Sequence, residues 1–289
     1  MSGTAIDFEG VRLTSPDKVL YPEQGVTKLA LAEYYRAVAP AMLPHVADRP
    51  ITLVRCPAGQ EKTCFYQRHA GSGVSDSLGQ VVVPGFEEPY LYLRDAAGLF
   101  ALVQMGVLEI HPWGARRDRP DRPDRVVFDF DPGEGVTFAD VVAAALDMRA
   151  RLGRLGLVGV CKTSGGKGLH LVVPIERRHD YPEVKAFAKA VSEQAAREMP
   201  ERYLTRISKA ERVGRILIDY LRNDPTSTAI APYSTRARPK ATVSTPLDWS
   251  EVTPGLDPAC FTIETVPIRL QGLGDPWASV GDIRQRLPR

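Results

Sequence analysis

Two aspartates placed two positions apart, in the run FDFDPGEG (128–135), constrain this chain more than any other feature. Asp129 and Asp131 lie in an apolar stretch that a Pro-Gly pair stops, which is the pattern of a buried strand followed by a turn. Because side chains alternate along a strand, the two carboxylates share one face, and Phe128 and Phe130 share the other. One face of this strand must therefore meet apolar helices while the other holds two neighbouring negative charges.

The segments that follow predict a split βαβ, or ferredoxin-like, sheet. Their periodicity indicates strand, helix, strand, strand, helix and strand, at 126–131, 138–153, 157–163, 169–174, 182–198 and 215–221. Thr137 and Asp140 occupy capping-box positions at the start of the first helix. This order places the first strand in the middle of an antiparallel sheet, between the third and fourth, with both helices on one face. The opposite face is then available for a site.

The first ~110 residues predict a separate mixed α/β unit. Helices are expected at 28–46, capped by Thr27, and near 95–106, and short strands at 51–56, 64–67, 81–83, 90–93 and 107–111. The proline-broken stretch 112–125 is typical of a connector. We therefore expect an α/β (α+β) chain forming a single domain over 1–289, with an N-terminal subdomain at 1–120 and a second, RRM-like subdomain at 121–289.

The overall composition argues against several classes of protein and site. The net charge of +2 does not mark a nucleic-acid binder, so any anion-binding surface must come from local clusters of Lys and Arg. The four cysteines form no C-x-x-C pair, which indicates neither a zinc site nor a disulfide framework, and reduced thiols are expected. With no leader pattern and no apolar run near the roughly 18 residues of a membrane span, we expect a cytoplasmic protein with no membrane association.

A third aspartate and a glycine-rich turn are expected beside the first two. Asp219 lies in the hydrophobic strand RILIDYLRND (215–224), next to the acidic strand in the predicted topology. The turn of KTSGGKGLH (162–170) offers Ser164, Lys167 and His170, and its glycines let backbone N–H groups approach phosphates. Carboxylate oxygens suit Mg²⁺ or Mn²⁺, and two such ions above a triphosphate support nucleotidyl transfer to a 3′-hydroxyl.

Other interpretations of these residues are weaker or excluded. Gly168 stands where a Walker A loop needs Ser or Thr, Glu134 where a calcium loop needs its glycine, and no K-x-D-G lysine motif of a DNA ligase is present. A lone D-x-D is commonly solvated or paired with arginine, and His170 equally fits a core histidine. A D-x-D glycosyltransferase using Mn²⁺ and a single-stranded RNA-binding sheet remain as alternative functions.

The motifs DFDPGEG, SGGKGLH and IDYLRN, with DKVLYP (17–22) and APYSTRAR (231–238), resemble the polymerase domain of bacterial ligase D, a member of the archaeo-eukaryotic primase superfamily. The resemblance runs from about residue 10 to about residue 285. It implies a primase-polymerase fold and a metal-dependent, template-directed nucleotidyltransferase of non-homologous end joining in the bacterial nucleoid. A stand-alone primase-polymerase of gap repair, an excised domain and a partner of a separate ligase all fit it.

The same resemblance implies ligands and partners. Two Mn²⁺ (or Mg²⁺) ions, NTP or dNTP substrates with a preference for ribonucleotides, and gapped or broken DNA bearing a 5′-phosphate are expected. Ku and a DNA ligase module are expected as partners.

The resemblance also implies roles for individual residues of this chain. The implied catalytic metal ligands are Asp129, Asp131 and Asp219, and the implied nucleotide-binding residues are Ser164, Lys167, His170, His111, Arg236 and Arg238. Lys18 and Lys28 match a pocket for the downstream 5′-phosphate, although either lysine in isolation would be read as solvated surface. The template contacts are matched by Arg55, Phe65 and Tyr66, and Arg68 stands where relatives carry a lysine. Because Phe65 and Tyr66 are adjacent on a strand, at least one is expected in the core.

Overall fold

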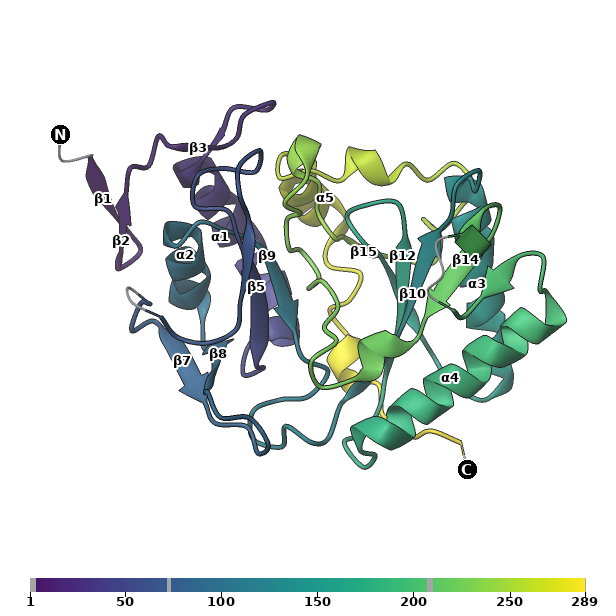
Figure 1. Ribbon diagram of the computed structural model, residues 1–289. Coiled ribbons are helices and arrows are strands. Elements are labelled where there is room, and N and C mark those ends of the chain that lie inside the picture. The colour runs from purple at the N-terminus through teal and green to yellow at the C-terminus, as the bar shows by residue number, and fades with distance from the viewer. Residues whose placement is uncertain (1–3, 72–73, 207–209, 289) are drawn as a thin grey trace. The chain divides into compact units, whose positions relative to one another are not determined.

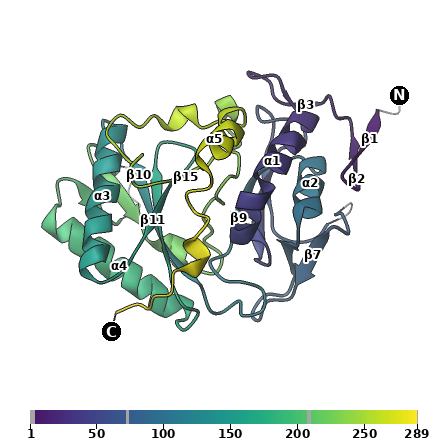
Figure 2. The ribbon, with the colours of Figure 1, turned by 180° about the vertical axis from the view of Figure 1, so that it is seen from behind.

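The computed structural model describes residues 4–288 except 72–73 and 207–209, and its contacts divide the chain into two compact units (Figures 1 and 2). Unit 1 consists of Met1–Pro112, Ile230–Ser244 and Ala259–Gly274, and unit 2 consists of Trp113–Ala229, Thr245–Pro258 and Asp275–Arg289. The units are discontinuous in sequence, whereas the sequence division assigns everything after residue 120 to one subdomain. Two C-terminal segments therefore belong to the N-terminal unit.

Unit 2 is built on a mixed sheet whose order among the described strands is β13-β14-β10-β12-β11-β15. Their bounds are β10 (Arg125–Pro132), β11 (Val160–Thr163), β12 (Leu169–Pro174), β13 (Tyr203–Leu204), β14 (Ile216–Asp219) and β15 (Pro246–Leu247). Strand β10 pairs antiparallel with β12 on one side and with β14 on the other. The predicted central position of the acidic strand is confirmed.

Two long helices, α3 (Phe138–Arg154) and α4 (Tyr181–Glu198), pack against β10. Helix α3 begins with the predicted capping box, in which Thr137 Oγ1 accepts from the Asp140 N–H and Asp140 accepts from the Thr137 N–H. Phe128 and Phe130 are fully buried, as expected for the face that the helices cover. The alternation of side chains then puts the aspartates on the opposite face of the sheet.

Unit 1 contains short sheets and three helices among its described residues. The helices are α1 (Lys28–Val46), α2 (Ala96–Gln104) and α5 (Thr265–Leu273), and three strands form a sheet in the order β6 (Phe65–Gln67), β5 (Ile51–Arg55) and β9 (Val107–Pro112). Three two-stranded pairs complete it: β1 (Ala5–Phe8) with β2 (Val11–Thr14), β3 (Val19–Tyr21) with β4 (Val26–Thr27), and β7 (Leu78–Val81) with β8 (Tyr90–Leu93). Thr27 caps α1 as predicted. The strong start signal of a helix is thus read correctly from the sequence.

Strand β7 differs from the prediction, which placed a strand at 81–83. The observed strand begins at Leu78 because Gly79 pairs with Tyr92 of β8, and a Cβ at residue 79 would lie 2.1 Å from the Tyr92 ring. Only glycine leaves room for that ring. The valine run is typical of a strand by propensity, but Val82 is 71% exposed and the chain turns directly after it.

The expectation that every cysteine is a reduced thiol is wrong for Cys56 and Cys64, which form a disulfide. Antiparallel pairing sets Arg55 opposite Phe65, so the residues just beyond this pair on the two strands come close together, with 4.3 Å between their Cα atoms. Cys161 and Cys260 carry free thiols. Among the residues that the structure describes, no helix combines the length and apolarity needed to cross a membrane.

Candidate metal and nucleotide site

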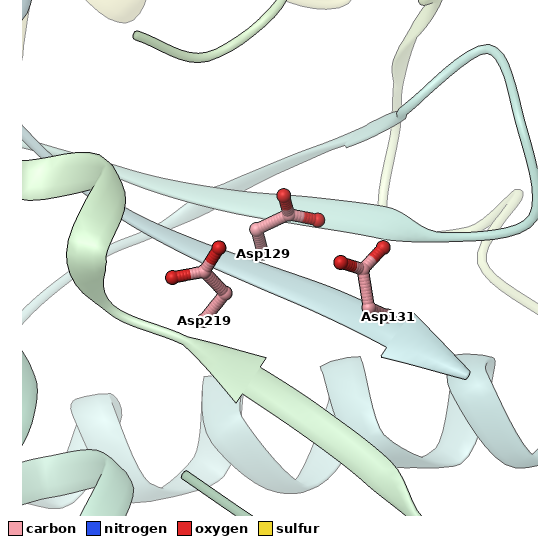
Figure 3. Close-up of side chains that lie close together, drawn as sticks. All are labelled: Asp129, Asp131 and Asp219. Carbon is pink, nitrogen blue, oxygen red and sulfur yellow. The ribbon is translucent and has the colours of Figure 1, made fainter. Parts of the chain in front are cut away.

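Three carboxylates meet on the face of the unit 2 sheet that lies opposite its helices (Figure 3). Asp129 on β10 is directly opposite Asp219 on β14, and Asp131 follows two positions along β10 on the same face. One oxygen from each residue lies within 4.8 Å of the others. The register of two neighbouring strands therefore brings together the three acids that the sequence singled out.

Among the residues that the structure describes, the ion pairs of this acidic cluster, defined here as Asp129, Asp131 and Asp219, involve Asp129 and Asp219. Nε2 of His170, on β12, lies 3.2 Å from Oδ1 of Asp129. Arg222 donates from Nε to Asp129 Oδ2 at 3.1 Å, and its Nη2 lies 3.2 Å from Asp219 Oδ2. The Arg222 guanidinium thus bridges two of the three carboxylates.

The three carboxyl groups of the cluster differ in the direction of their pKa shifts. Burial alone would raise the pKa of Asp129, but the neighbouring His170, Arg222 and Lys162 hold it below its ordinary value. Burial and then the charge of Asp129 raise the pKa of Asp131 to about 6. Burial also raises the pKa of Asp219, an effect that Arg222 partly offsets and Asp129 reinforces. Burial and the charge of Asp129 therefore favour the protonated form of Asp131 and Asp219, and Arg222 offsets this only in part.

These residues fit a divalent cation. The donors are all carboxylate oxygens, the ligand type that Mg²⁺ and Mn²⁺ prefer. Oδ1 of Asp129 is buried and accepts no hydrogen bond from the described residues. A cation would offset the repulsion that raises the pKa of Asp131 and Asp219. The acidic cluster thus has the chemistry of a metal-dependent polymerase.

His170 is a buried histidine that faces the acidic cluster. It is 3% exposed, and burial lowers its pKa to about 4, partly offset by Asp129. At neutral pH its ring is uncharged. The alternative of a core histidine satisfied by a backbone carbonyl does not describe it, since Nδ1 has no hydrogen-bond partner among the described residues.

The glycine-rich turn between β11 and β12 is shaped by Ser164. Its hydroxyl oxygen accepts from the N–H groups of Gly166 and Gly168, at 3.3 and 3.2 Å. A Cβ at Gly168 would lie 2.4 Å from the carbonyl oxygen of Phe130, so the turn packs directly on the β10 backbone. Lys167 is exposed at the tip of this turn. Nucleotide contacts by Ser164 and Lys167 stay predictions.

A second polar cluster lies in unit 1, around Glu109 on β9. The Nε2 atom of His111 lies 2.8 Å from Oε2 of Glu109, and Arg236 donates from Nε to Oε1 at 3.0 Å. The structure thus brings together two predicted nucleotide-binding residues through a carboxylate that the sequence reasoning missed. Arg238 is exposed and lies outside these contacts.

Lys18 and Lys28, the predicted 5′-phosphate residues, lie close to each other in unit 1. Lys28 is only 6% exposed and donates from Nζ to the carbonyl oxygen of Thr14 at 2.7 Å. It is therefore not a solvated surface lysine, as its sequence position in isolation would suggest. Burial, and then the charge of Lys18, lowers the pKa of Lys28. Lys18 is exposed, and its Nζ donates to the carbonyl oxygen of Pro57. Two cations held this near to each other favour an anionic ligand.

Phe65 and Tyr66, the predicted template contacts, are 45% and 74% exposed. The expectation that one of them lies in the core is wrong, because β6 is a three-residue strand at the edge of its sheet and neither of its faces is covered. The Arg55 guanidinium lies 5.4 Å from the centre of the Phe65 ring, and its Nη1 donates to Gln67 Oε1. Phe65 and Arg55 therefore lie together, while the Tyr66 ring is exposed next to Phe65 in the same strand.

Three polar residues were missed by sequence reasoning: Glu109, Lys162 and Arg222. Lys162 is 2% exposed on β11, opposite His170 in the register of the sheet. The spacing of Glu109 and His111 puts them on one face of a strand, which is the same signal that identified the D-x-D pair. Arg222 follows Asp219 by three residues but lies beyond the end of β14, so the alternation of side chains along the strand does not predict where it points.

A split βαβ sheet that gathers three carboxylates on the face opposite its helices fits a nucleotidyltransferase of the primase-polymerase type. Residues 27–277 match the family model described as LigD, primase-polymerase domain. The chain belongs to this family of nucleotidyltransferases acting on DNA.

Its relatives are longer proteins. One named "Multifunctional non-homologous end joining protein LigD", from Pseudomonas aeruginosa, is 39% identical over 283 residues, covering 96% of this chain and 34% of that protein. The "Bifunctional non-homologous end joining protein LigD" of Bacillus subtilis is 31% identical over 269 residues, covering 92% of this chain and 43% of that protein. The chain thus spans about a third to under a half of the length of these relatives.

A solved structure agrees with the fold. The polymerase domain from Mycobacterium tuberculosis ligase D, solved in complex with DNA, superposes with a TM-score of 0.88 at 32% identity, covering 96% of this chain and 99% of that one. The predicted α/β primase-polymerase fold is confirmed.

Proposed function

We propose that this chain is a template-directed polymerase of bacterial non-homologous end joining, which extends a primer 3′-hydroxyl across gaps and breaks in nucleoid DNA. The observation that carries the proposal is the convergence of Asp129, Asp131 and Asp219 from two neighbouring strands. Membership of the LigD primase-polymerase family and relatives named for end joining support it. A glycosyltransferase that relies on D-x-D alone has no need for the third acid.

The residues divide the work of phosphoryl-type transfer. Two Mn²⁺ or Mg²⁺ ions on the acidic cluster would supply activation of the 3′-hydroxyl and neutralisation of the leaving pyrophosphate. The backbone N–H groups of the turn at 164–168 and the ammonium of Lys167 would hold the triphosphate. The neutral His170 ring, 3.2 Å from Asp129, would orient that carboxylate. Arg236 and Arg238 would help to bind the phosphates, and His111 would contact the nucleotide sugar.

The substrate preferences are part of the proposal. We infer that ribonucleotides are preferred over deoxyribonucleotides, and that Lys18 and Lys28 recognise the 5′-phosphate of the downstream strand. Two neighbouring ammonium groups, of which one is exposed, suit a phosphate monoester. Phe65 and Tyr66 would stack on template bases, with Arg55 on the backbone, each stacked base contributing roughly 1–3 kcal/mol. Ku and a ligase module are the proposed partners.

Replacing Asp129 by alanine tests the central assignment. We expect Asp129→Ala to abolish extension of a gapped, 5′-phosphorylated duplex while leaving DNA affinity nearly unchanged. The matched control is Asp118→Asn. The Asp118 carboxylate pairs with the two Nη atoms of Arg177, at 2.8 and 2.9 Å, and is not part of the acidic cluster. Parent-like extension by Asp129→Ala, or turnover of a sugar nucleotide by the parent, contradicts the proposal.

The substrate preferences need a second assay. Extension rates are compared for NTP against dNTP, Mn²⁺ against Mg²⁺, and a 5′-phosphate against a 5′-hydroxyl on the downstream strand. Lys18→Ala is expected to reduce the 5′-phosphate preference, whereas Lys189→Ala, a surface lysine that pairs with Glu193 on α4, should not. Equal rates on the two downstream ends in the parent would favour a general primase-polymerase of gap repair.

A further inference from the structure

Glu109 is the centre of a buried polar network that the metal chemistry does not use. Its side chain lies on β9 and the residue is 6% exposed. Oε2 lies 2.8 Å from His111 Nε2, while Oε1 accepts from Arg236 Nε at 3.0 Å and from the Ala237 N–H at 2.8 Å. Both oxygens of one carboxylate are therefore committed to the residues of the second polar cluster.

The carboxylate is ionised at neutral pH. Burial alone would raise the pKa of Glu109, but the hydrogen bond from His111 and the charge of Arg236 outweigh it and lower the pKa to about 2. A carboxylate only accepts hydrogen bonds, so the imidazole must carry a proton on Nε2. The contact thereby selects one tautomer of His111 and directs Nδ1 away from Glu109.

The same carboxylate orients Arg236. Its contact is made through Nε, the nitrogen nearest the aliphatic stem, which fixes the plane in which the two terminal Nη groups lie. The neighbouring Ala237 N–H, bound to the same oxygen, keeps the backbone of this segment in register with β9. Glu109 thus determines how both His111 and Arg236 are presented.

The segment that carries Arg236 is anchored to β9 by other contacts as well. Thr235 Oγ1 donates to the carbonyl oxygen of Leu108 at 2.6 Å, and the Ile110 N–H donates to Ser234 Oγ at 2.9 Å. The hydroxyl of Tyr21 donates to the carbonyl oxygen of Arg236 at 2.9 Å. Loss of the Glu109 charge therefore leaves the backbone anchored and removes one contact from each of the two side chains.

We propose that Glu109 is a positioning residue for nucleotide binding, which holds His111 in one tautomer and aligns the Arg236 guanidinium for the polyphosphate. This inference rests on the proposed function, which assigns His111 and Arg236 to the incoming nucleotide. Glu109 itself touches no reacting atom. Its effect is therefore expected in nucleotide affinity, with DNA binding unchanged.

The test is a kinetic comparison of Glu109→Gln and Glu109→Asp with the parent enzyme. Gln keeps the shape but places an NH₂ group against one of the donors, so we expect the KM for the nucleotide to rise about tenfold or more, with a smaller change in kcat. Asp keeps the charge but is one methylene shorter, and its KM should lie between those of the parent and Glu109→Gln. The affinity for gapped DNA should not change.

The matched control is Asp147→Asn in unit 2. Asp147 also joins an arginine to a second donor, accepting from Arg151 Nε at 2.9 Å and from the Tyr203 hydroxyl at 3.1 Å. A general loss of stability from breaking such a network would appear in both variants, whereas the KM change should appear only at Glu109. In an Arg236→Ala background, Glu109→Gln should add less than it does alone.

Nucleotide affinity is also measured directly, by titrating the parent and the variants with Mn²⁺ and a nucleoside triphosphate that cannot be cleaved between the α- and β-phosphates. A folded Glu109→Gln protein whose affinity and KM stay within twofold of the parent overturns the inference, as does a melting-temperature loss without a KM change. A parent that binds the nucleotide but extends no DNA contradicts the proposed function alone. A parent that does not bind it overturns the inference about Glu109.

Discussion

The acidic cluster of unit 2 and the Glu109 network of unit 1 contain the same chemical group with its pKa shifted in opposite directions. Burial favours the protonated form at both places. In the acidic cluster, burial and the neighbouring Asp129 raise the pKa of Asp131 to about 6. At Glu109, burial is outweighed by His111 and Arg236, which lower the pKa to about 2. The balance between burial and charged partners therefore sets the direction in which each pKa moves.

The difference separates two uses of a buried acid. Glu109 has a donor for each oxygen, so it needs no further ligand and can only hold its neighbours in place. The three acids of the cluster share the Arg222 guanidinium, which reaches two of them. A carboxylate set that is short of positive charge is built to receive a cation, whereas a saturated carboxylate is built to orient its donors.

The largest expected effect is on catalysis. Asp219→Asn removes the one acid that comes from a different strand, and we expect primer extension to fall on the order of 10³-fold or more, since metal-assisted charge neutralisation contributes several kcal/mol. Single-turnover extension in Mn²⁺ measures it. A loss below about tenfold would mean that Asp129 and Asp131 suffice, as in the glycosyltransferase alternative.

Glu109→Gln should lower the stability of the metal-free protein by about 3 kcal/mol, because removing one partner of a buried ion pair leaves the other charge uncompensated. Urea or thermal unfolding in the presence of a chelator measures the change. Glu33→Gln, which removes an exposed partner of Arg36, is the matched surface control and should cost well under about 1 kcal/mol. Equal losses of unfolding free energy in the two variants would contradict the conclusion that both oxygens of Glu109 are bound by hydrogen-bond donors.

Mn²⁺ should stabilise the parent by about 2.7 kcal/mol at one hundred times its Kd, because the ion binds only the folded acidic cluster. The melting temperature with and without Mn²⁺ measures this. Glu109→Gln should keep the full increase, and Asp219→Asn should lose most of it. An equal increase in both variants would place the ion elsewhere.

The smallest expected effect is a gain in stability, opposite in sign to the loss expected for Glu109→Gln. Asp131→Asn should raise the stability of the metal-free protein by about 1 kcal/mol at pH 7 while impairing extension. Because the folded pKa of Asp131 is raised to about 6 from 3.8, its stabilising protonated form is complete below about pH 4 and is lost as the pH rises through 6. The gain from Asn should therefore grow over that range. A variant that is less stable than the parent at pH 7 would mean that the cluster is not short of cations.

The sequence predicts the elements whose signals are local. Strand β10 was read from alternation, α1 from Thr27, and α3 from the capping box at 137–140. The order of the sheet followed from the topology of the split βαβ unit, and with it the meeting of Asp129 and Asp219. Periodicity and connection rules were enough for these features.

Features that depend on a distant partner were not predicted. Strand β7 begins at Leu78 because Tyr92 needs the space over Gly79, and Cys56 reaches Cys64 only because β5 and β6 pair. Arg222 and Lys162 join the acidic cluster through the reach and direction of long side chains, which no spacing encodes. Exposure of both Phe65 and Tyr66 follows from the position of β6 at a sheet edge.

Gly168 explains why the turn at 164–168 lacks the hydroxyl that a Walker A loop carries at this position. Adding Ser or Thr there, as an engineer might to convert the turn into a P-loop, would push a Cβ against the Phe130 carbonyl oxygen at 2.4 Å and separate the turn from β10. In the proposed function, metal coordination therefore falls to the carboxylates on the strands. A side chain at residue 168 and the packing of this turn on β10 are sterically exclusive.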